Sequence, residues 1–211
     1  MNQVDTDLFY WINSHHTSWL DWVMWIASQG WSWVVVISAA IIYMVTKADS
    51  RRWASLGWIV AGVGLCFLLS DRISVLCFKD VFCRLRPCHA LENVRMFRTS
   101  CGGLYGFVSS HAANVFSLAL FLSLYHAKKA SVHPKSSIFT FHLSPFTFHL
   151  SLFIWACLVG YSRPYLGKHY PGDVVCGALL GLAVGTVVFF LVQHAEKWVD
   201  RFVQQKKSSR Q

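Results

Sequence analysis

The sequence predicts an all-α fold: a polytopic membrane bundle of five to six transmembrane helices, preceded by an N-terminal interfacial helix. Hydrophobic residues make up 55% of the 211 positions and charged residues only 14%, whereas a soluble domain carries about 25% charge. Four uncharged runs are longer than the roughly 20 residues that a spanning helix needs: 22–46, 99–127, 136–162 and 174–195. These observations exclude a soluble globule, a disordered chain and a disulfide-stapled miniprotein.

The first 30 residues form a segment of their own. Between residues 5 and 30 aromatic side chains alternate with polar ones, as is typical of a helix at the membrane interface; the aromatic residues are Phe9, Trp11, Trp19, Trp22 and Trp25. The Ser-Gln-Gly triplet at 28–30 predicts a break after this segment. We therefore expect 1–30 to be an interfacial or amphipathic segment, with an extra span as the alternative.

Residues 31–195 are expected to form the transmembrane domain, followed by a basic cytoplasmic tail at 196–211. The uncharged runs, together with a fifth that starts at residue 53, predict five long helices at 31–46, 53–76, 108–127, 142–162 and 173–194. Eleven of the 19 Lys and Arg residues lie in the segments 47–52 and 128–135 and in the tail. Lys and Arg favour the cytoplasmic side, so the loops 79–106 and 163–172 are expected to face outward.

Seven cysteines are present, but their spacings contain no C-x-x-C pair. A structural zinc site is therefore not expected, and we predict no metal and no cofactor. Cys88 and Cys101 fall in the same outward loop, where an oxidising compartment would permit a disulfide. The sequence leaves open whether they pair or remain two free thiols.

A cluster of cations opens the outward loop at 79–87. Lys79, Arg84 and Arg86 lie within eight residues, in a loop where positive charge is disfavoured. A guanidinium bonds two phosphate oxygens at once, and an ammonium supplies a compact point charge. We interpret Lys79 and Arg86 as phosphate ligands, with anchoring at the interface as the alternative.

A second cluster, Ser109, Ser110 and His111, stands where the third long helix is expected to begin. A serine there is an ordinary N-cap, but the free amides and dipole of a helix N-terminus also bind anions. An imidazole one turn into a membrane helix is costly unless it faces a polar cavity. Glycines at 102, 103 and 106 allow a close approach of the backbone.

The third cluster joins the last two predicted helices and contains Arg163, Lys168, His169 and Asp173. His169 and Asp173 are four residues apart, a spacing that lets a carboxylate orient one ring nitrogen and leave the other free for nucleophilic catalysis. Such a pair alone is more often a structural hydrogen bond. The catalytic interpretation depends on all three clusters meeting at one membrane face.

These motifs resemble the type 2 phosphatidic acid phosphatase superfamily of membrane lipid phosphatases. The first cluster is K-x6-R-P and the third is S-R-x5-H-x3-D, while the middle one keeps the Ser and His of the usual Pro-Ser-Gly-His as 108–111. The resemblance covers roughly residues 50–195. It implies an all-helical core, metal-free catalysis and a covalent phosphohistidine.

The resemblance also implies a role for each matched residue. His169 would be the nucleophile, oriented by Asp173, and His111 would protonate the leaving oxygen. Lys79, Arg86 and Arg163 would hold the phosphoryl oxygens, together with Ser109 and nearby amides. Ser110 replaces the usual glycine of the motif and would bind the phosphate through its amide.

The expected substrate is a lipid phosphate or diphosphate, with membrane lipids as surroundings and no nucleic acid as partner; the oligomeric state is not predicted. The short chain resembles bacterial undecaprenyl-diphosphate phosphatases, and Arg84, Arg95 and Arg98 would suit a second phosphate, or be solvated loop charges. The alternatives are phosphatidylglycerophosphate, phosphatidate and lipid A, or a non-catalytic transporter or binding protein. A bacterial inner membrane is expected, with the site facing the periplasm or the extracellular side.

Overall fold

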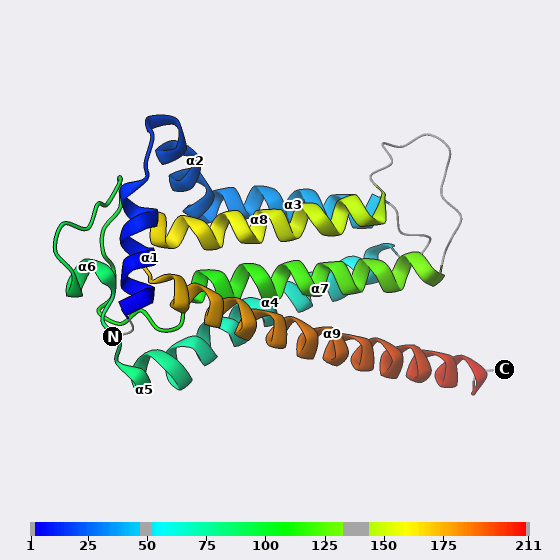
Figure 1. The fold of residues 1–211 in the computed structure, drawn as a ribbon. Coiled ribbons are helices and arrows are strands. Elements are labelled where there is room, and N and C mark those ends of the chain that lie inside the picture. Colours follow the sequence, from blue (N-terminus) through cyan, green and yellow to red (C-terminus); the bar gives the residue numbers. More distant parts are fainter. Residues whose placement is uncertain (1–2, 47–51, 133–143, 210–211) are drawn as a thin grey trace.

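The protein is an almost entirely helical bundle that has been analysed as a computed structural model describing residues 3–46, 52–132 and 144–209 (Figure 1). Its five long helices run roughly side by side. They are α3 (Gly30–Thr46), α4 (Arg52–Ile73), α7 (Ser110–Val132), α8 (Pro145–Tyr165) and α9 (Pro171–Ser208). All five lie where the uncharged runs predict long helices, within a few residues except at the C-terminus of α9.

Two shorter helices, α1 (Gln3–Ser14) and α2 (Ser18–Ser28), precede the bundle and lie at one end of it (Figure 1). The predicted break after residue 28 is present, because α2 and α3 meet at a bend of 68°. Several N-terminal aromatic side chains are exposed, as expected for an interfacial segment, whereas Phe9 is fully buried against the ring of Tyr170.

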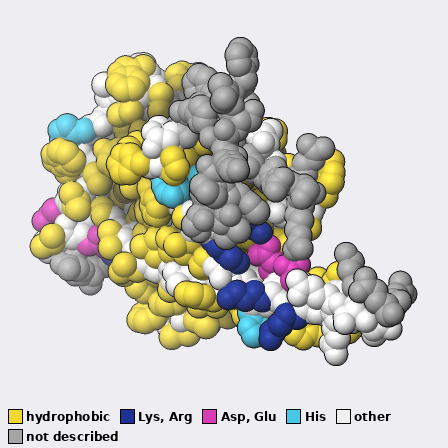
Figure 2. Space-filling view, turned by 90° about the vertical axis from the view of Figure 1, so that its right-hand side faces the viewer, with side chains coloured by type: hydrophobic (Ala, Val, Ile, Leu, Met, Phe, Trp, Pro, Cys, Tyr) yellow, Lys and Arg dark blue, Asp and Glu magenta, His cyan; other side chains and the backbone are white. Residues whose placement is uncertain are grey.

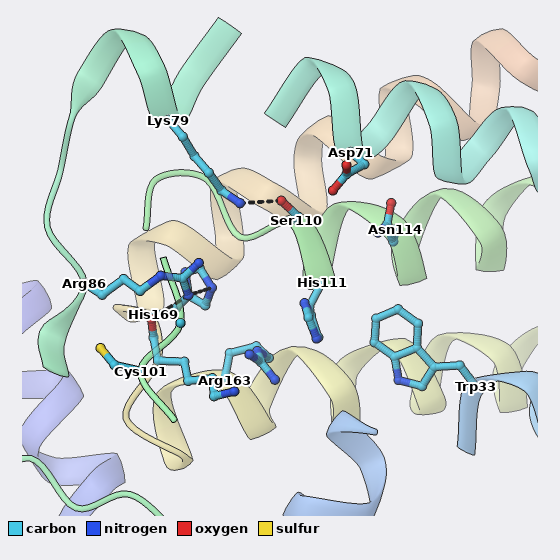
Figure 3. A pocket seen from close by; sticks show the side chains of 12 residues that line it. Trp33, Asp71, Lys79, Arg86, Cys101, Ser110, His111, Asn114, Arg163 and His169 are labelled. Carbon is cyan, nitrogen blue, oxygen red and sulfur yellow. Dashed lines mark hydrogen bonds between the residues drawn. The ribbon is translucent and has the colours of Figure 1, made fainter. Parts of the chain in front are cut away.

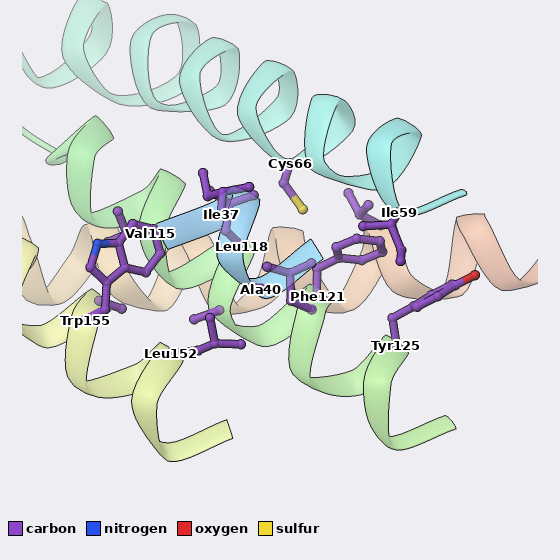
Figure 4. Close-up of a cluster of buried hydrophobic side chains, with 14 of the residues drawn as sticks. Ile37, Ala40, Ile59, Cys66, Val115, Leu118, Phe121, Tyr125, Leu152 and Trp155 are labelled. Carbon is purple, nitrogen blue, oxygen red and sulfur yellow. The ribbon is translucent and has the colours of Figure 1, made fainter. Parts of the chain in front are cut away.

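Helix α7 is the centre of the bundle and packs against α4, α8 and α9. Its inward side chains, among them Val115, Leu118 and Phe121, are fully buried. They meet Ile59 and Cys66 of α4 and residues of α3 and α8 in one apolar cluster (Figure 4). This cluster fixes the angular position of α7, whose first turn carries the Ser-Ser-His motif.

Close packing of α9 on α7 depends on three glycines four residues apart: Gly177, Gly181 and Gly185. A Cβ atom added at any of them would clash with a backbone carbonyl of α7, at Ser109, Ala113 and Ser117 respectively. Small residues at this spacing let membrane helices approach closely. The stripe therefore brings the N-terminus of α9, with Asp173, against the N-terminus of α7.

By length and composition, three of the described helices can cross a membrane, or four if the bent pair α2–α3 counts as one span. Helix α7 is not among them, because its buried face carries polar side chains such as Asn114, Ser117 and Ser123. Other helices surround it, so these groups do not face lipid. A membrane bundle is thus present, and the count of five to six spans stays a prediction.

The two ends of the bundle differ in chemistry. Helix α1 and the loops between α4 and α7 and between α8 and α9 gather at one end (Figure 1). At the other end Lys128 and Lys129 of α7 both bond the carboxylate of Glu196 on α9. Figure 2 shows Lys and Arg side chains beside acidic ones on this face. The two loops with the site motifs therefore lie at the opposite end from the lysines of α7.

Candidate active site

A cavity of about 320 Å³ lies at the loop end of the bundle and contains residues from all three motifs. Figure 3 shows Lys79, Arg86, His169 and Arg163 on one side, Asp71, Asn114 and Trp33 on the other, and Ser110 and His111 between them. Six of the eight residues proposed from the sequence thus line one cavity, and a seventh, Asp173, lies beside His169. The eighth, Ser109, lies behind its wall.

Lys79 is the last residue of η1 (Ser74–Lys79), a π-helical turn that continues α4 before the short helix α5 (Asp80–Phe82). Wider turns of this kind occur frequently at functional sites, because they turn a side chain out of the regular helical register. The ammonium of Lys79 donates a hydrogen bond to Ser110 Oγ at 2.6 Å. Ser110 Oγ also lies 2.6 Å from Ser74 Oγ, so this hydroxyl is held at the cavity wall.

Arg86 precedes the one-turn helix α6 (Pro87–Ala90) and is held by a short antiparallel pairing of the loop with itself. Its amide donates to the carbonyl of Leu104, and the amide of Gly106 donates to the carbonyl of Arg84. A Cβ atom on Gly106 would come within 3.2 Å of both Arg86 Cγ and Asp173 Oδ2. The absence of a side chain at 106 therefore allows Arg86 and Asp173 to come together.

The guanidinium of Arg86 lies 2.8 Å from Nε2 of His169 (Figure 3). Because a guanidinium only donates hydrogen bonds, Nε2 must be the acceptor, and the proton of the neutral ring is on Nδ1. Burial, and then the positive charges of Arg86, Arg163 and Lys79, hold the pKa of His169 well below its usual range. His169 is therefore a neutral imidazole with the lone pair of Nε2 directed toward Arg86.

Asp173, in the first turn of α9, is completely buried and faces the other ring nitrogen of His169. Its Oδ2 lies 3.6 Å from Nδ1 and accepts a hydrogen bond from the amide of Tyr170 at 3.0 Å. Its Oδ1 accepts one from Arg84 at 2.8 Å. Nδ1 has no hydrogen-bond partner among the described residues, so a small movement of the ring would complete the His–Asp pair.

Arg163 and Lys168 complete the cationic side of the cavity. Arg163 is almost fully buried and its Nε has no partner, as is also true of Nε of Arg86. Burial, followed by the charges of Arg163 and Arg86, lowers the pKa of Lys168 to about 8. Burying a cation without a counter-charge is costly, and no carboxylate pairs with Arg163 in the described part of the chain. These groups are therefore arranged for an anionic ligand.

The residues of the middle motif have different positions at the start of α7. The hydroxyl of Ser109 accepts a hydrogen bond from the amide of Ala112 and caps α7, while its own amide donates to the carbonyl of Asp173. Ser110 and His111 line the cavity. The His111 ring meets the Trp33 ring nearly edge to face, with centroids 5.0 Å apart. Trp33 is a cavity residue that the sequence analysis missed, because it lies far from the motifs.

The three extra arginines considered for a second phosphate are engaged elsewhere. Arg84 bridges Asp173 and Asp5, and Arg95 forms two hydrogen bonds with the carboxylate of Asp21. Arg98 lies over the Trp22 ring at 4.8 Å. Apart from Asp173, the partners in these contacts belong to α1 and α2. The cations that line the cavity are therefore Lys79, Arg86, Arg163 and Lys168. The three extra arginines do not form a second cationic cluster beside them.

Cys88 and Cys101 form a disulfide, so the pairing left open by the sequence is the one present. His89 lies close to both sulfur atoms, but a disulfide offers no thiolate to ligate a metal. The bond closes the loop that carries Arg95 and Arg98, and Cys101 lines the cavity.

The site geometry defines a class: a membrane-embedded phosphate-binding site with a neutral histidine held between cations and a carboxylate. The chain belongs to the PAP2 superfamily, whose family model matches residues 52–197. It is 31% identical over 203 residues to the lipid A 4′-phosphatase of Porphyromonas gingivalis, covering 93% of this chain and 77% of the relative. It is also 31% identical to the lipid A 4′-phosphatase of Bacteroides thetaiotaomicron, with coverage of 92% and 79%.

The fold has a solved counterpart in the transmembrane PAP2-type phosphatidylglycerolphosphate phosphatase of Bacillus subtilis. The TM-score is 0.57 at 22% identity, over 96% of this chain and 90% of that one. This likeness supports the fold. The family match and the two relatives show that the protein is a membrane lipid phosphatase of the PAP2 superfamily. The expected likeness to undecaprenyl-diphosphate phosphatases is corrected, because the relatives matching nearly the whole chain carry another name. The arginines that suggested a diphosphate pair mainly with the N-terminal segment instead.

Proposed function

We propose that this enzyme removes a phosphate monoester from lipid A, at the 4′ position named for its two relatives. Both relatives match more than nine tenths of the chain. A single phosphate also suits the cavity better than a diphosphate, because Arg84, Arg95 and Arg98 are already engaged. Of the alternatives considered from the sequence, lipid A is the one that the comparisons and the distribution of charge jointly support.

The observation that carries the reaction type is the set of buried, unpartnered donors around His169 Nε2. Nε of Arg86 and Nε of Arg163 have no partner among the described residues, and both guanidinium groups line the same cavity. Transfer of a phosphoryl group needs neutralisation of its equatorial oxygens and an in-line nucleophile. The donors supply the first, and Nε2 the second.

In the proposed reaction the phosphate displaces the hydrogen bond between Arg86 and Nε2, since the guanidinium gains a charged acceptor. Binding of the phosphate anion beside His111 favours its protonated form. Nε2 then attacks phosphorus while the bond to the sugar oxygen breaks, and the protonated His111 gives its proton to the departing oxygen. Asp173 stabilises the positive ring through the proton on Nδ1. In the second half, His111 removes a proton from water, which attacks the phosphohistidine and releases inorganic phosphate and His169.

We further propose that the site faces the periplasm. The disulfide Cys88–Cys101 lies in the loop that borders the cavity, and disulfides persist in oxidising compartments. Lys128, Lys129 and the basic tail lie at the opposite end, where the positive-inside rule favours the cytoplasm. An impermeant thiol reagent applied to intact cells tests the orientation in a variant whose five free cysteines are replaced by serine. In that background a cysteine replacing Ser100 should be labelled and one replacing Ser208 should not.

The experiment that tests the substrate measures phosphate release by purified enzyme in detergent. The panel comprises lipid A, phosphatidylglycerophosphate, phosphatidate and undecaprenyl diphosphate, with and without EDTA, and His169→Ala as the blank. We expect the highest kcat/KM on lipid A, unchanged by EDTA, and a product that mass spectrometry shows has lost the 4′-phosphate. A preference for any other lipid would overturn the substrate, and loss of turnover in EDTA would overturn the metal-free chemistry.

A further inference from the structure

The cavity has a second, non-cationic side that the proposed chemistry does not use. Asp71 of α4 and Asn114 of α7 lie there, opposite His169 and Arg163 (Figure 3). Both residues also border an adjoining groove of about 460 Å³ along α4, lined further by Gly64, Phe67, Leu68 and Arg72. The pair thus forms the wall shared by the phosphate cavity and a mainly apolar groove.

Both residues offer unused hydrogen-bond acceptors. Asn114 is only 9% exposed, and its Oδ1 is buried without a hydrogen-bond partner among the described residues. Asp71 is exposed at the groove, and in the described part of the chain no hydrogen bond or ion pair engages its carboxylate. Leaving a buried acceptor without a partner costs roughly 1–3 kcal/mol of folding free energy. An apolar residue at position 114 would avoid this cost, so the asparagine is explained by a ligand that binds to it.

An acidic side chain is also out of place beside a phosphate site, because it repels the ligand that Lys79 and Arg163 attract. Asp71 lies across the cavity from Arg163 (Figure 3), although its charge still acts on Lys79. What meets Asp71 is therefore the part of the substrate beyond the ester oxygen. His111 stands between the two sides, which is where the oxygen joining phosphate to its headgroup must lie.

We propose that Asp71 and Asn114 form a headgroup subsite that accepts hydrogen bonds from hydroxyl or amide N–H groups of the substrate. The inference rests on the proposed function and sharpens it to a substrate class: a phosphate ester of a donor-rich headgroup such as a sugar. A polyprenyl or simple alkyl phosphate has no donor beyond the phosphate and gains nothing here. Trp33 closes this side and keeps its ring against His111.

The test compares two substrates that share the phosphate and differ in the headgroup: lipid A and dodecyl phosphate. Asp71→Asn and Asn114→Ala should each lower kcat/KM on lipid A by about ten- to a hundredfold, the loss expected for a hydrogen bond to a charged or buried group. On dodecyl phosphate both variants should stay within about twofold of wild type, since the phosphate contacts are intact. Equal losses on both substrates would overturn the subsite.

Asp80→Asn is the matched control. Asp80 is an exposed carboxylate on the same stretch of chain, and like Asp71 it acts electrostatically on Lys79, but it does not line the cavity. It should leave the ratio of the two kcat/KM values unchanged. If Asp80→Asn shifts that ratio as far as Asp71→Asn does, the effect is one of charge near Lys79 and the subsite is wrong.

A binding measurement separates this inference from the choice of lipid. Titration calorimetry on His169→Ala, which binds without turnover, compares glucosamine 4-phosphate with methyl phosphate. The sugar phosphate should bind about tenfold more tightly, and Asp71→Asn introduced into the same protein should remove the difference. If lipid A is not hydrolysed but this difference holds, the proposed substrate fails and the subsite stands. Equal affinities would overturn the subsite whatever the lipid.

Discussion

The bundle from residue 52 to 197 and the two helices before residue 30 contribute different things to one active site. The bundle supplies the cations and the histidines that line the cavity, and its region is the one that the family model covers. The N-terminal helices supply carboxylates: Asp5 bonds Arg84 and the amide of Gly172, and Asp21 bonds Arg95 and Tyr165. The chemistry thus belongs to the bundle, whereas the charge balance of its loops depends on a segment outside it.

The largest expected loss of activity comes from a substitution in the bundle. His169→Ala should abolish turnover, because the attacking atom Nε2 is lost and no other imidazole nitrogen in the described site is held between Arg86 and a carboxylate. Rapid quenching with ³²P-labelled substrate should show acid-labile label on wild type and none on the variant. Label that persists on His169→Ala would falsify the assignment of the nucleophile.

His111→Ala should reduce kcat by about 10²–10⁴-fold, the usual contribution of a general acid. The loss should be smallest for a substrate with an acidic leaving group, such as a nitrophenyl phosphate, because that oxygen departs without a proton. Comparing kcat for alkyl and nitrophenyl esters measures this difference. An equal loss on both esters would mean that His111 has another role, for example in binding.

The N-terminal segment is tested by Asp5→Asn, which weakens the hold on Arg84 and so on Asp173. A charge-assisted hydrogen bond is worth about 1.5 kcal/mol or more, so we expect kcat to fall about tenfold while KM changes little. Asp7→Asn is the control, since Asp7 is exposed and bonds only Gln3 among the described residues. A rise in KM with kcat unchanged would show that Asp5 acts on the residues that bind the phosphate instead.

The smallest expected effect is a pH dependence at Lys168. Its pKa is lowered to about 8 by burial and by Arg163 and Arg86, so its positive charge is lost as the pH rises through 8, well before an ordinary lysine would titrate. KM should then rise by roughly fivefold, as expected for ~1 kcal/mol from a partly exposed charge contact. Lys168→Arg should keep KM flat to pH 9. A rise in the arginine variant would assign the titration to another group.

The sequence predicted the parts of this molecule that have a local signature. Uncharged runs located the five long helices, and motif spacing located the cationic loop, the α7 N-terminus and the His169–Asp173 pair. The contacts of the N-terminal helices could not be predicted, because Asp5 and Arg84 are 79 positions apart. Nothing in the sequence indicates which aspartate pairs with which arginine over such a separation. The glycine stripe at 177, 181 and 185 was visible as a four-residue repeat but was not used.

The expectation of a diphosphate substrate, which the comparisons do not support, arose for the same reason. Arg84, Arg95 and Arg98 looked free for a second phosphate, because nothing in the sequence shows that their partners come from α1 and α2. Trp33 and Asn114 escaped notice because each lies within an uncharged run, where one tryptophan or one amide has no distinguishing neighbour. Asp71 escaped notice because it stands beside Arg72 at the end of another run, as an ordinary flanking charge would. Only the packing of α3, α4 and α7 brings them to one wall.

The length of α9 has a consequence for the traffic of lipids. About 23 residues separate Asp173, at the cavity, from Glu196, which pairs with Lys128 and Lys129, and at 1.5 Å per residue this is ~35 Å. That distance lies between the ~30 Å of a bilayer's apolar core and the ~40–45 Å that includes its headgroups, so we expect the cavity to meet the headgroups of one leaflet only. We expect lipid made in the other leaflet to become a substrate only after it has been flipped, so that the extent of dephosphorylation would report how much lipid has crossed the membrane.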